Sequence, residues 1–436
     1  MCILSYSSLS YNTRSTRKSL WQMPPVMESA VREIILINVS GEDKPGVTRA
    51  VSEVLEEHGS DILDIGQAVI HDSLNLGILA KISENQVASQ VQKEILYSLH
   101  AMDMKVKFQP ISEESYELWV GQQGKPRHIV TLLAHRVSAQ HIARVTSVTV
   151  EHGLNIDKIT RLSGRVPLER IDDDSKACVE FSLRGVPEDL SSLRASLLEL
   201  SVEMDVDVAY QEDNIYRRNR RLVVFDMDST LIDAEVIDEL AKEAGVGEQV
   251  SAIGELNIKS ALGFKESFAK RMALLKGLDE SVLENVTKRL RLTDGAEELM
   301  STLKRLGYKT AILSGGFDYF AERVQDKLGI DYVYANQLEI VDGKVTGKVT
   351  GEVVDGQRKA QLLREIAAGE NIDLEQVIAV GDGANDVPML SIAGLGIAFR
   401  AKPLVKATAK QSISKLGLDG ILYLMGFSDR DTLHLQ

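Results

Sequence analysis

The sequence predicts two tandem small α+β domains followed by an α/β domain built on a parallel sheet. The tripeptide Glu57-His58-Gly59 recurs 94 residues later as Glu151-His152-Gly153, which marks an internal repeat too long for a solenoid unit. Beyond the repeats, three short apolar runs are each followed by small or acidic residues. This pattern is typical of buried parallel strands with a site at their carboxyl ends.

The composition excludes several classes of protein. A chain of 436 residues suggests two to four domains at roughly 100–200 residues each. With 44% hydrophobic and 26% charged residues, it has the composition of a folded globular protein, and it has no apolar run of 18 residues that would predict a membrane span. The net charge of −14 disfavours nucleic acid as a partner. Its two cysteines, Cys2 and Cys178, are too few for a disulfide framework, so we expect a cytoplasmic protein.

The first residues have a composition of their own. Residues 1–26 contain no acidic residue and lack the continuous apolar segment of a secretory signal. Their Ser- and Arg-rich composition resembles a transit peptide, but Pro24-Pro25 breaks any helix there. We therefore expect a disordered leader over 1–30, with Met27 as an alternative start.

Each repeat has an apolar strand, a loop, a helix and a second strand. A glycine suits the left-handed position that ends each helix. The histidine before it lies at the C-terminal end, where the helix dipole favours a positive charge. We therefore expect His58 and His152 to cap their helices rather than to take part in catalysis. The expected elements are strand 33–39, helix 46–58 and strand 68–70, then strand 128–134, helix 139–152 and strand 159–162.

The loop before the first helix reads Asp43-Lys44-Pro45-Gly46. Pro45 fits a helix start, and Gly46 leaves backbone N–H groups open to a carboxylate. This loop and the repeat resemble ACT domains, which are ferredoxin-like α+β modules that often bind amino acids. The resemblance implies ACT domains at 31–112 and 126–210 and an amino-acid effector. The second repeat departs from the loop pattern, and two interpretations stay open: the domains only form a homo-oligomer, a dimer or tetramer, by sheet pairing, or they also bind a ligand.

A short basic segment separates the repeats from the last domain. Residues 211–221 hold four arginines in five positions, at 217, 218, 220 and 221. Such a patch can indicate nucleic acid or a membrane surface. Because it is short, we expect a solvated linker, with neither nucleic acid nor membrane as a partner.

The first apolar run of the last domain, 222–225, is followed by Asp226 and Asp228. In an extended chain, side chains two residues apart point the same way, and two adjacent carboxylates repel unless a cation or proton intervenes. Oxygen-only ligands suit Mg²⁺. The simpler interpretation is turn chemistry at a strand end.

Three further segments outweigh the turn interpretation. The run 310–313 ends in Ser314-Gly315-Gly316, whose hydroxyl and backbone N–H groups can cradle phosphate oxygens. The run 377–380 ends in Gly381-Asp382-Gly383-Ala384-Asn385-Asp386, with two more carboxylates and an amide. Lys359, at the start of a helix between them, is a candidate positive clamp on a phosphoryl group.

In combination these motifs resemble the haloacid dehalogenase superfamily and, with Glu235 and Phe317, the branch that acts on O-phospho-L-serine. The resemblance implies a Rossmann-like domain over 222–436 with a helical cap near 233–292. It also implies an Mg²⁺-dependent phosphatase that releases L-serine and phosphate in the final step of serine biosynthesis.

The resemblance further implies a role for each matching residue. Asp226 is the nucleophile that forms an aspartyl-phosphate, and Asp228 is the general acid and base. The other expected roles are Mg²⁺ held by Asp226, the backbone carbonyl of Asp228 and Asp382; phosphate bound by Ser314, Gly315, Lys359 and Asn385; Lys359 or a metal-bound water oriented by Asp386; the substrate ammonium and carboxylate bound by Glu235 and Arg271; and the site shielded from water by Phe264.

Alternatives remain open at this stage. The same fold could act on another small phosphate monoester, such as phosphohomoserine, or transfer phosphate to an alcohol. A non-catalytic ACT amino-acid sensor is a third possibility. From the residues alone, Glu235 and Arg271 are ordinary helix charges.

Overall fold

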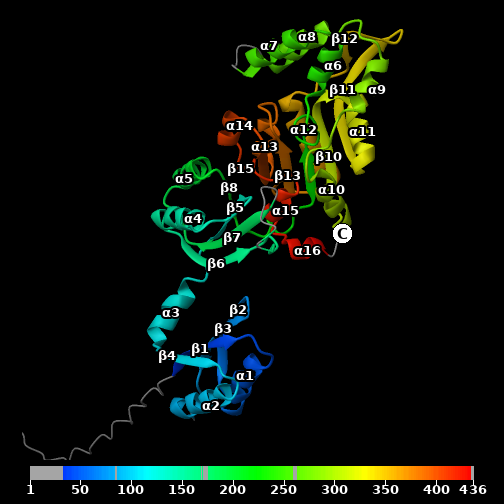
Figure 1. Ribbon diagram of the computed structural model, residues 1–436. Helices are drawn as coiled ribbons and strands as arrows, with labels where there is room; N and C mark the ends of the chain where they lie inside the picture. Colours follow the sequence, from blue (N-terminus) through cyan, green and yellow to red (C-terminus); the bar gives the residue numbers. More distant parts are fainter. Residues whose placement is uncertain (1–32, 84–85, 168, 170–174, 259–262, 434–436) are drawn as a thin grey trace, which may run out of the picture. The chain divides into compact units, whose positions relative to one another are not determined.

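The computed structural model describes residues 33–83, 86–167, 169, 175–258 and 263–433. The leader expected over 1–30 lies outside them. The chain divides into two compact units, Met1–Gly124 and Lys125–Gln436, which are described separately (Figure 1). Among the described residues, no helix is long and apolar enough to cross a bilayer.

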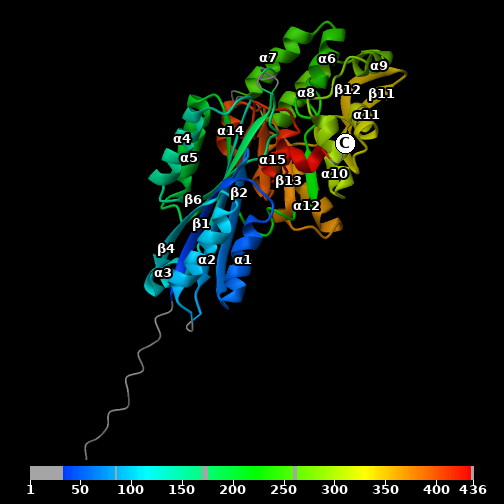
Figure 2. The ribbon, with the colours of Figure 1, turned by 60° about the horizontal axis from the view of Figure 1, so that its bottom comes forward.

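The first unit is a four-stranded antiparallel sheet with two helices packed on it. Its elements are β1 (Ile34–Glu42), α1 (Val47–Glu57), β2 (Asp61–Ile70), β3 (Ser73–Lys81), α2 (Ala88–His100), β4 (Lys105–Ile111) and α3 (Glu113–Gly121). The strand order is β2-β3-β1-β4, and α1 and α2 lie side by side (Figure 2). The expected first strand and helix are confirmed, and the second strand is longer than the sequence indicated.

The second repeat folds in the same way. Its elements are β5 (Arg127–Ala134), α4 (Ala139–Glu151), β6 (Asn155–Arg161), β7 (Ala177–Arg184), α5 (Leu190–Glu203) and β8 (Asp207–Glu212). The order β6-β7-β5-β8 is that of the first repeat, element for element. His58 and His152 are the C-cap residues of α1 and α4, and Gly59 and Gly153 follow with positive φ, as predicted.

The last domain contains a seven-stranded sheet. Its strands are β9 (Leu222–Phe225), β10 (Lys309–Phe317), β11 (Tyr332–Val341), β12 (Lys344–Thr350), β13 (Val377–Gly381), β14 (Leu395–Phe399) and β15 (Gln411–Ile413). The order is β12-β11-β10-β9-β13-β14-β15, and every pairing is parallel except β11 with β12. That pair is a hairpin that turns at Asp342 and Gly343, both with positive φ.

Helices cover both faces of this sheet. They are α10 (Ala296–Arg305), α11 (Asp318–Leu328), α12 (Gly356–Gly369), the 3₁₀ turn η2 (Leu374–Gln376), α13 (Val387–Ile392), α14 (Pro403–Thr408), α15 (Gly420–Leu424) and α16 (Asp429–Leu433). In β9, Val223 and Phe225 pack into the core shared with α10 and α11, whereas Leu222 and Val224 pack into the core shared with α12 and α13. Burial on both faces explains why the strand is apolar throughout.

The segment between β9 and β10 forms the helical cap that the resemblance implied. Its helices are α6 (Val236–Glu243), α7 (Gly247–Ile258), α8 (Phe264–Leu274) and α9 (Ser281–Thr287). The chain enters and leaves the cap side by side, because Ile232 bridges Leu292 and Asp233 N–H donates to the Arg291 carbonyl at 3.0 Å. The cap is therefore a single insertion whose two ends are hydrogen-bonded to each other.

The second repeat is fastened to the seven-stranded sheet where the edge strands β8 and β15 meet. The Gln411 side chain accepts from Tyr210 N–H at 2.7 Å and donates back to the Tyr210 carbonyl. Asp207 Oδ2 accepts from the backbone N–H groups of Ser414 and Lys415 at 2.6 and 2.7 Å. Side chains of each edge therefore satisfy the backbone of the other.

The basic segment is solvated only in part: Arg218 and Arg221 are exposed as expected, but the other two arginines are buried. Arg217 and Arg220 are only 5% and 8% exposed. Arg217 pairs with Glu180 of the second repeat, and Arg220 donates to the Glu375 carbonyl of the last domain. Since a buried guanidinium requires partners, these two arginines join the repeat to the sheet domain.

Candidate active site

Neighbouring parallel strands bring three aspartates together. Asp226 follows β9 and Asp382 follows β13, and these strands pair with Phe225 opposite Val380. Asp226 N–H donates to the Val380 carbonyl at 2.9 Å. Asp386 stands directly before α13. The carboxyl ends of the two central strands therefore define the site, as expected for an open α/β sheet.

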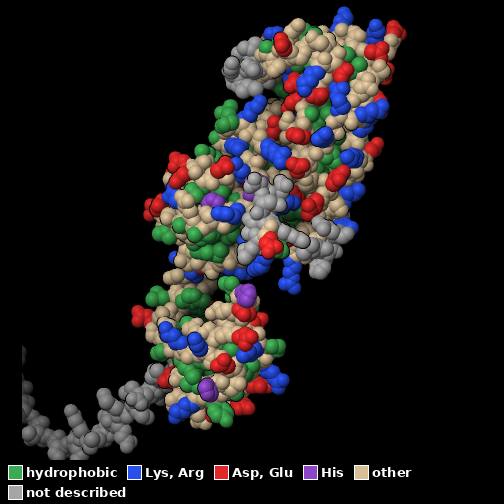
Figure 3. All heavy atoms as spheres, viewed as in Figure 1, with side chains coloured by type: hydrophobic (Ala, Val, Ile, Leu, Met, Phe, Trp, Pro, Cys, Tyr) green, Lys and Arg blue, Asp and Glu red, His purple; other side chains and the backbone are tan. Residues whose placement is uncertain are grey.

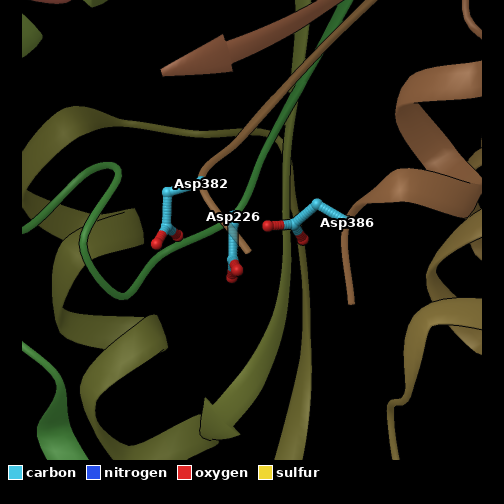
Figure 4. A group of neighbouring side chains, drawn as sticks. All are labelled: Asp226, Asp382 and Asp386. Atoms are coloured by element: carbon cyan, nitrogen blue, oxygen red, sulfur yellow. The ribbon is translucent and has the colours of Figure 1, made fainter. Parts of the chain in front are cut away.

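The three carboxylates form a compact group. Asp226, Asp382 and Asp386 each offer an oxygen, and these oxygens all lie within 4.8 Å of one another. Figure 4 shows Asp382 and Asp386 on either side of Asp226. Asp226 and Asp386 are buried and Asp382 is half-buried. The side chain of Asp228 is not part of the group, and its expected ligand atom was its backbone carbonyl. An all-oxygen set of this size fits a hard divalent cation.

Lys359 is the positive charge within this group. Its Nζ lies 2.8 Å from Asp226 Oδ2 and 2.7 Å from Asp386 Oδ1, and its side chain is fully buried. Burial alone would lower the Lys359 pKa, but the two carboxylates raise it above its ordinary value. Three carboxylates face one ammonium, so the group keeps an excess of negative charge.

Burial, together with this crowding of negative charge, raises the pKa of two carboxyl groups in the set. Burial raises the pKa of Asp382 to about 8, and the charges of Asp386 and Asp226 add to the effect. Burial, followed by the charge of Asp226, raises the pKa of Asp386 to about 7. The arrangement therefore favours a bound cation or retained protons.

The loop after β13 needs its glycines. A Cβ on Gly381 would lie 2.4 Å from Cγ of Asp386, and one on Gly383 would lie 2.3 Å from Oδ1 of Asn385. Either substitution would displace a side chain of the site. The glycines of the Gly-Asp-Gly motif thus let Asp386 and Asn385 fold back over the backbone.

Asp228 and Ser314 meet at Gly316. Ser314 Oγ accepts from Gly316 N–H at 2.9 Å, and a Cβ on Gly316 would lie 2.5 Å from Asp228 Oδ2. Burial, then the charges of Glu235 and Asp226, raise the pKa of Asp228 well above its usual range. Asp228 is therefore suited to hold a proton at neutral pH. The strand β10 continues through this loop to Phe317.

The turn after β9 differs from the extended chain assumed from the sequence. The strand ends at Phe225, and Ser229 has a left-handed backbone with φ of 55°. Ser229 Oγ donates to Glu235 Oε1 at 3.0 Å, and Glu235 directly precedes α6. Glu235 remains open to solvent, yet the surrounding protein and then Asp226 raise its pKa. The turn places Glu235 beside the carboxylate group.

The cap places two further expected residues near the site. Phe264 covers the loop, since a Cβ on Gly315 would lie 3.0 Å from Phe264 Cζ. Phe264 stacks on Phe268 with ring centroids 5.9 Å apart. Within the described part of the chain, the buried Nε of Arg271 has no hydrogen-bond partner. The charge of Arg271 opposes the rise in the Glu235 pKa, so its guanidinium lies near that carboxylate.

Two residues that support the site were not identified from the sequence. Asn336 donates to the Gly315 carbonyl and accepts from Val354 N–H, both at 2.8 Å. Asp355 caps α12, where Oδ1 accepts from Arg358 N–H at 2.9 Å. An aspartate directly before a helix is an N-cap signal that could have indicated Asp355. No local pattern marks Asn336, because its contacts are distant in sequence.

Three family matches divide the chain in the same way as its sheets. Haloacid dehalogenase-like hydrolases match residues 223–391. ACT domains match residues 33–109 and again 126–211. The two matched ACT segments cover the two four-stranded sheets except for the last residues of β4 and β8, and the hydrolase segment contains the carboxylate group.

Curated relatives resemble nearly the whole chain. The phosphoserine phosphatase of Streptomyces coelicolor is 38% identical over 399 residues, which is 90% of this chain and 92% of the relative. That of Mycobacterium tuberculosis is 37% identical over 393 residues, or 90% of this chain and 93% of the relative.

Solved structures agree with these relatives. A haloacid dehalogenase family hydrolase from Salmonella enterica serovar Typhi has a TM-score of 0.58 at 32% identity, covering 68% of this chain and 98% of its own. A probable phosphoserine phosphatase from Vibrio cholerae has a TM-score of 0.54 at 32% identity, covering 72% and 89%. The chain therefore belongs to the phosphoserine phosphatases of the haloacid dehalogenase-like hydrolases, with two ACT domains ahead of its catalytic domain.

Proposed function

We propose that this protein hydrolyses O-phospho-L-serine to L-serine and phosphate, the final step of serine biosynthesis, with Mg²⁺ as cofactor. The observation that carries the proposal is the buried group of three carboxylates around Lys359, with the unpartnered Arg271 Nε nearby on the cap. The first feature suits phosphoryl transfer, and the second suits an amino-acid carboxylate.

The donor set fits Mg²⁺. The proposed ligands are the carboxylates of Asp226 and Asp382 and the backbone carbonyl of Asp228, with Asp386 as a supporting residue. The ligands are all oxygen, and the raised pKa values of Asp382 and Asp386 indicate that a cation would relieve their repulsion. When bound, the ion neutralises charge on the phosphoryl group.

Asp226 is the proposed nucleophile. Its carboxylate attacks phosphorus, and the seryl oxygen leaves, which gives an aspartyl-phosphate. Asp228 donates a proton to that oxygen, and its raised pKa supports this role. Asp228 then removes a proton from the water that attacks the intermediate, and phosphate leaves Asp226.

The remaining phosphate contacts come from α12 and from the ends of β10 and β13. Lys359 supplies a fixed positive charge, and Asp386 holds Lys359 at 2.7 Å. The Ser314 hydroxyl and the Gly315 N–H bind the equatorial oxygens. Asn385 contacts the same phosphate.

Specificity is assigned to the cap side of the site. Arg271 binds the substrate carboxylate, and Glu235, oriented by Ser229, binds the ammonium. Phe264 covers the reacting group and excludes water. Phosphate monoesters that lack either charged group would lose these contacts.

The repeats belong to the same proposal. ACT domains at 31–112 and 126–210, a connecting segment at 211–221 and a catalytic domain at 222–436 with a cap at 233–292 would form a cytoplasmic homo-oligomer with an amino-acid effector. The exposed apolar residues of the edge strand β2 support pairing between copies: Ile62, Ile65, Val69 and Ile70. On the face seen in Figure 3, acidic and basic side chains are interspersed over the catalytic domain.

The test is phosphate release from O-phospho-L-serine, O-phospho-L-threonine and phosphohomoserine, with and without Mg²⁺. Phosphoserine should be preferred by roughly tenfold or more over phosphohomoserine, which carries one extra methylene. Activity spread evenly over the three esters would contradict the specificity assignment. Equal turnover after Mg²⁺ is removed by a chelator would contradict the assignment of Mg²⁺ as cofactor.

A further inference from the structure

Several contacts join the cap to the catalytic core, among them backbone hydrogen bonds from Gly277 and Glu280 to the β11–β12 hairpin, and three others bear on the argument here. The first is the bridge between Ile232 and Leu292. The second is the approach of Phe264 to Gly315. The third is an ion pair, in which Lys265 Nζ lies 3.1 Å from Asp355 Oδ2. The ion pair has no role in the chemistry proposed above.

Asp355 serves the cap and the core with different oxygens. Its Oδ1 accepts from Arg358 N–H and caps α12, and its Oδ2 faces Lys265 of α8. Its backbone carbonyl accepts from the N–H of Lys359 at 2.9 Å. Lys265 therefore binds the helix start that positions the phosphate-binding Lys359.

Lys265 also directly follows Phe264, the residue that covers Gly315. The first turn of α8 thus presents two adjacent contacts to the core, one apolar and one charged. The Lys265 side chain is 61% exposed, so its charge stays solvated when the pair opens; the Asp355 side chain is 19% exposed and keeps the Arg358 N–H as a partner. A contact of this kind adds little to folding but can bias an equilibrium between two cap positions.

We propose that the Lys265–Asp355 ion pair is a latch that holds the cap closed over the bound substrate, which makes Lys265 a positioning residue. The inference rests on the proposed function. Loss of the latch lowers the closed population and weakens apparent substrate binding, because only the closed cap brings Phe264 and Arg271 onto the substrate. The chemical step in the closed state is unchanged.

The test compares K265Q with K270Q in the full chain. Lys270 lies on the same helix and pairs with Glu266 of that helix, so K270Q removes the same charge without touching the core. K265Q should raise KM for O-phospho-L-serine roughly two- to fivefold with kcat within about twofold. K265E, which repels Asp355, should raise KM further, and K265R should restore it. Equal KM values for K265Q and K270Q would overturn the latch.

A second measurement does not depend on turnover. Amide hydrogen exchange of the segment containing Gly315, which Phe264 covers, should be faster in K265Q than in wild type and unchanged in K270Q. Equal exchange in wild type and K265Q overturns the latch. If wild type does not hydrolyse phosphoserine, the proposed function fails and the exchange result alone decides on the latch.

Discussion

Two regions of the second unit bury aspartates in opposite ways. At the junction between the second repeat and the sheet domain, Asp207 is 2% exposed, and its Oδ2 accepts hydrogen bonds from two backbone N–H groups. At the end of β9 and β13, three carboxylates share a single ammonium. Burial raises the pKa of Asp207 as well, but there two backbone donors oppose the rise, whereas the site retains a deficit of positive charge.

The difference teaches how a buried carboxylate can be assigned to structure or to chemistry. A fold that needs a charge only for packing supplies every partner itself. A fold that needs the charge for a ligand leaves room for a partner that is not part of the chain. The four predictions below test this contrast, from the largest expected effect to the smallest.

Asp226→Asn should lower kcat on the order of 10³-fold or more, because an amide cannot replace the carboxylate nucleophile. The fold should persist, since the substitution removes a charge from a crowded negative group. Phosphate release and circular dichroism measure the two effects. Asp326→Asn, on the exposed face of α11, is the matched control and should keep full activity. A kcat close to wild type in D226N would refute the assignment of the nucleophile.

Asp382→Asn should remove the stabilisation that Mg²⁺ gives to the folded protein. For a site that binds only the folded state, a concentration of about 100 Kd stabilises by about 2.7 kcal/mol. Thermal unfolding with and without Mg²⁺ should show an upward shift in wild type and in D326N but not in D382N. The same shift in all three proteins would show that Asp382 holds no metal.

Asp207→Ala should lower the free energy of unfolding by about 1–3 kcal/mol, because the N–H groups of Ser414 and Lys415 lose their acceptor. Turnover should change little, since the junction lies outside the carboxylate group. Urea unfolding measures the effect, and Asp326→Ala should stay within about 0.5 kcal/mol of wild type. If D207A and D326A have the same free energy of unfolding, Asp207 does not stabilise the junction.

Much of this contrast was foreseeable from the chain itself. The apolar runs at 222–225 and 377–380 predicted β9 and β13 with their aspartates at the carboxyl ends. A strand that is buried on both faces is apolar throughout, instead of alternating between apolar and polar residues. The burial of Arg217 and Arg220 could not be predicted, since their partners lie far along the chain. The Lys265–Asp355 ion pair could not be predicted for the same reason.

A partly buried ion pair in the first unit, His58 with Glu94, should give the smallest effect. His58 contacts Glu94 at 2.7 Å, and hydrogen bonds to Glu94 and then Gln86 raise the His58 pKa. The pair should stabilise fully below the ordinary histidine pKa of about 6.5 and lose this contribution as pH rises through the raised value.

The measurement is thermal unfolding of the full chain across that pH range. Glu94→Gln should flatten the decline in stability with rising pH, whereas Glu53→Gln, whose partner Arg49 does not titrate there, should not. An unaltered pH slope in E94Q would show that the pair contributes nothing measurable.

The hydrogen-bonded contact between the edge strands β8 and β15 has a consequence for solubility. An unpaired sheet edge is a template for pairing with other chains, and the second repeat covers the β15 edge with Tyr210, which pairs with the Gln411 side chain, and with Asp207, which accepts from Ser414 N–H. A chain truncated to begin at 222 would uncover the backbone of β15 and keep the whole carboxylate group. Such a fragment should retain the chemistry yet self-associate on storage, so the second repeat acts as a built-in guard against aggregation of the catalytic domain.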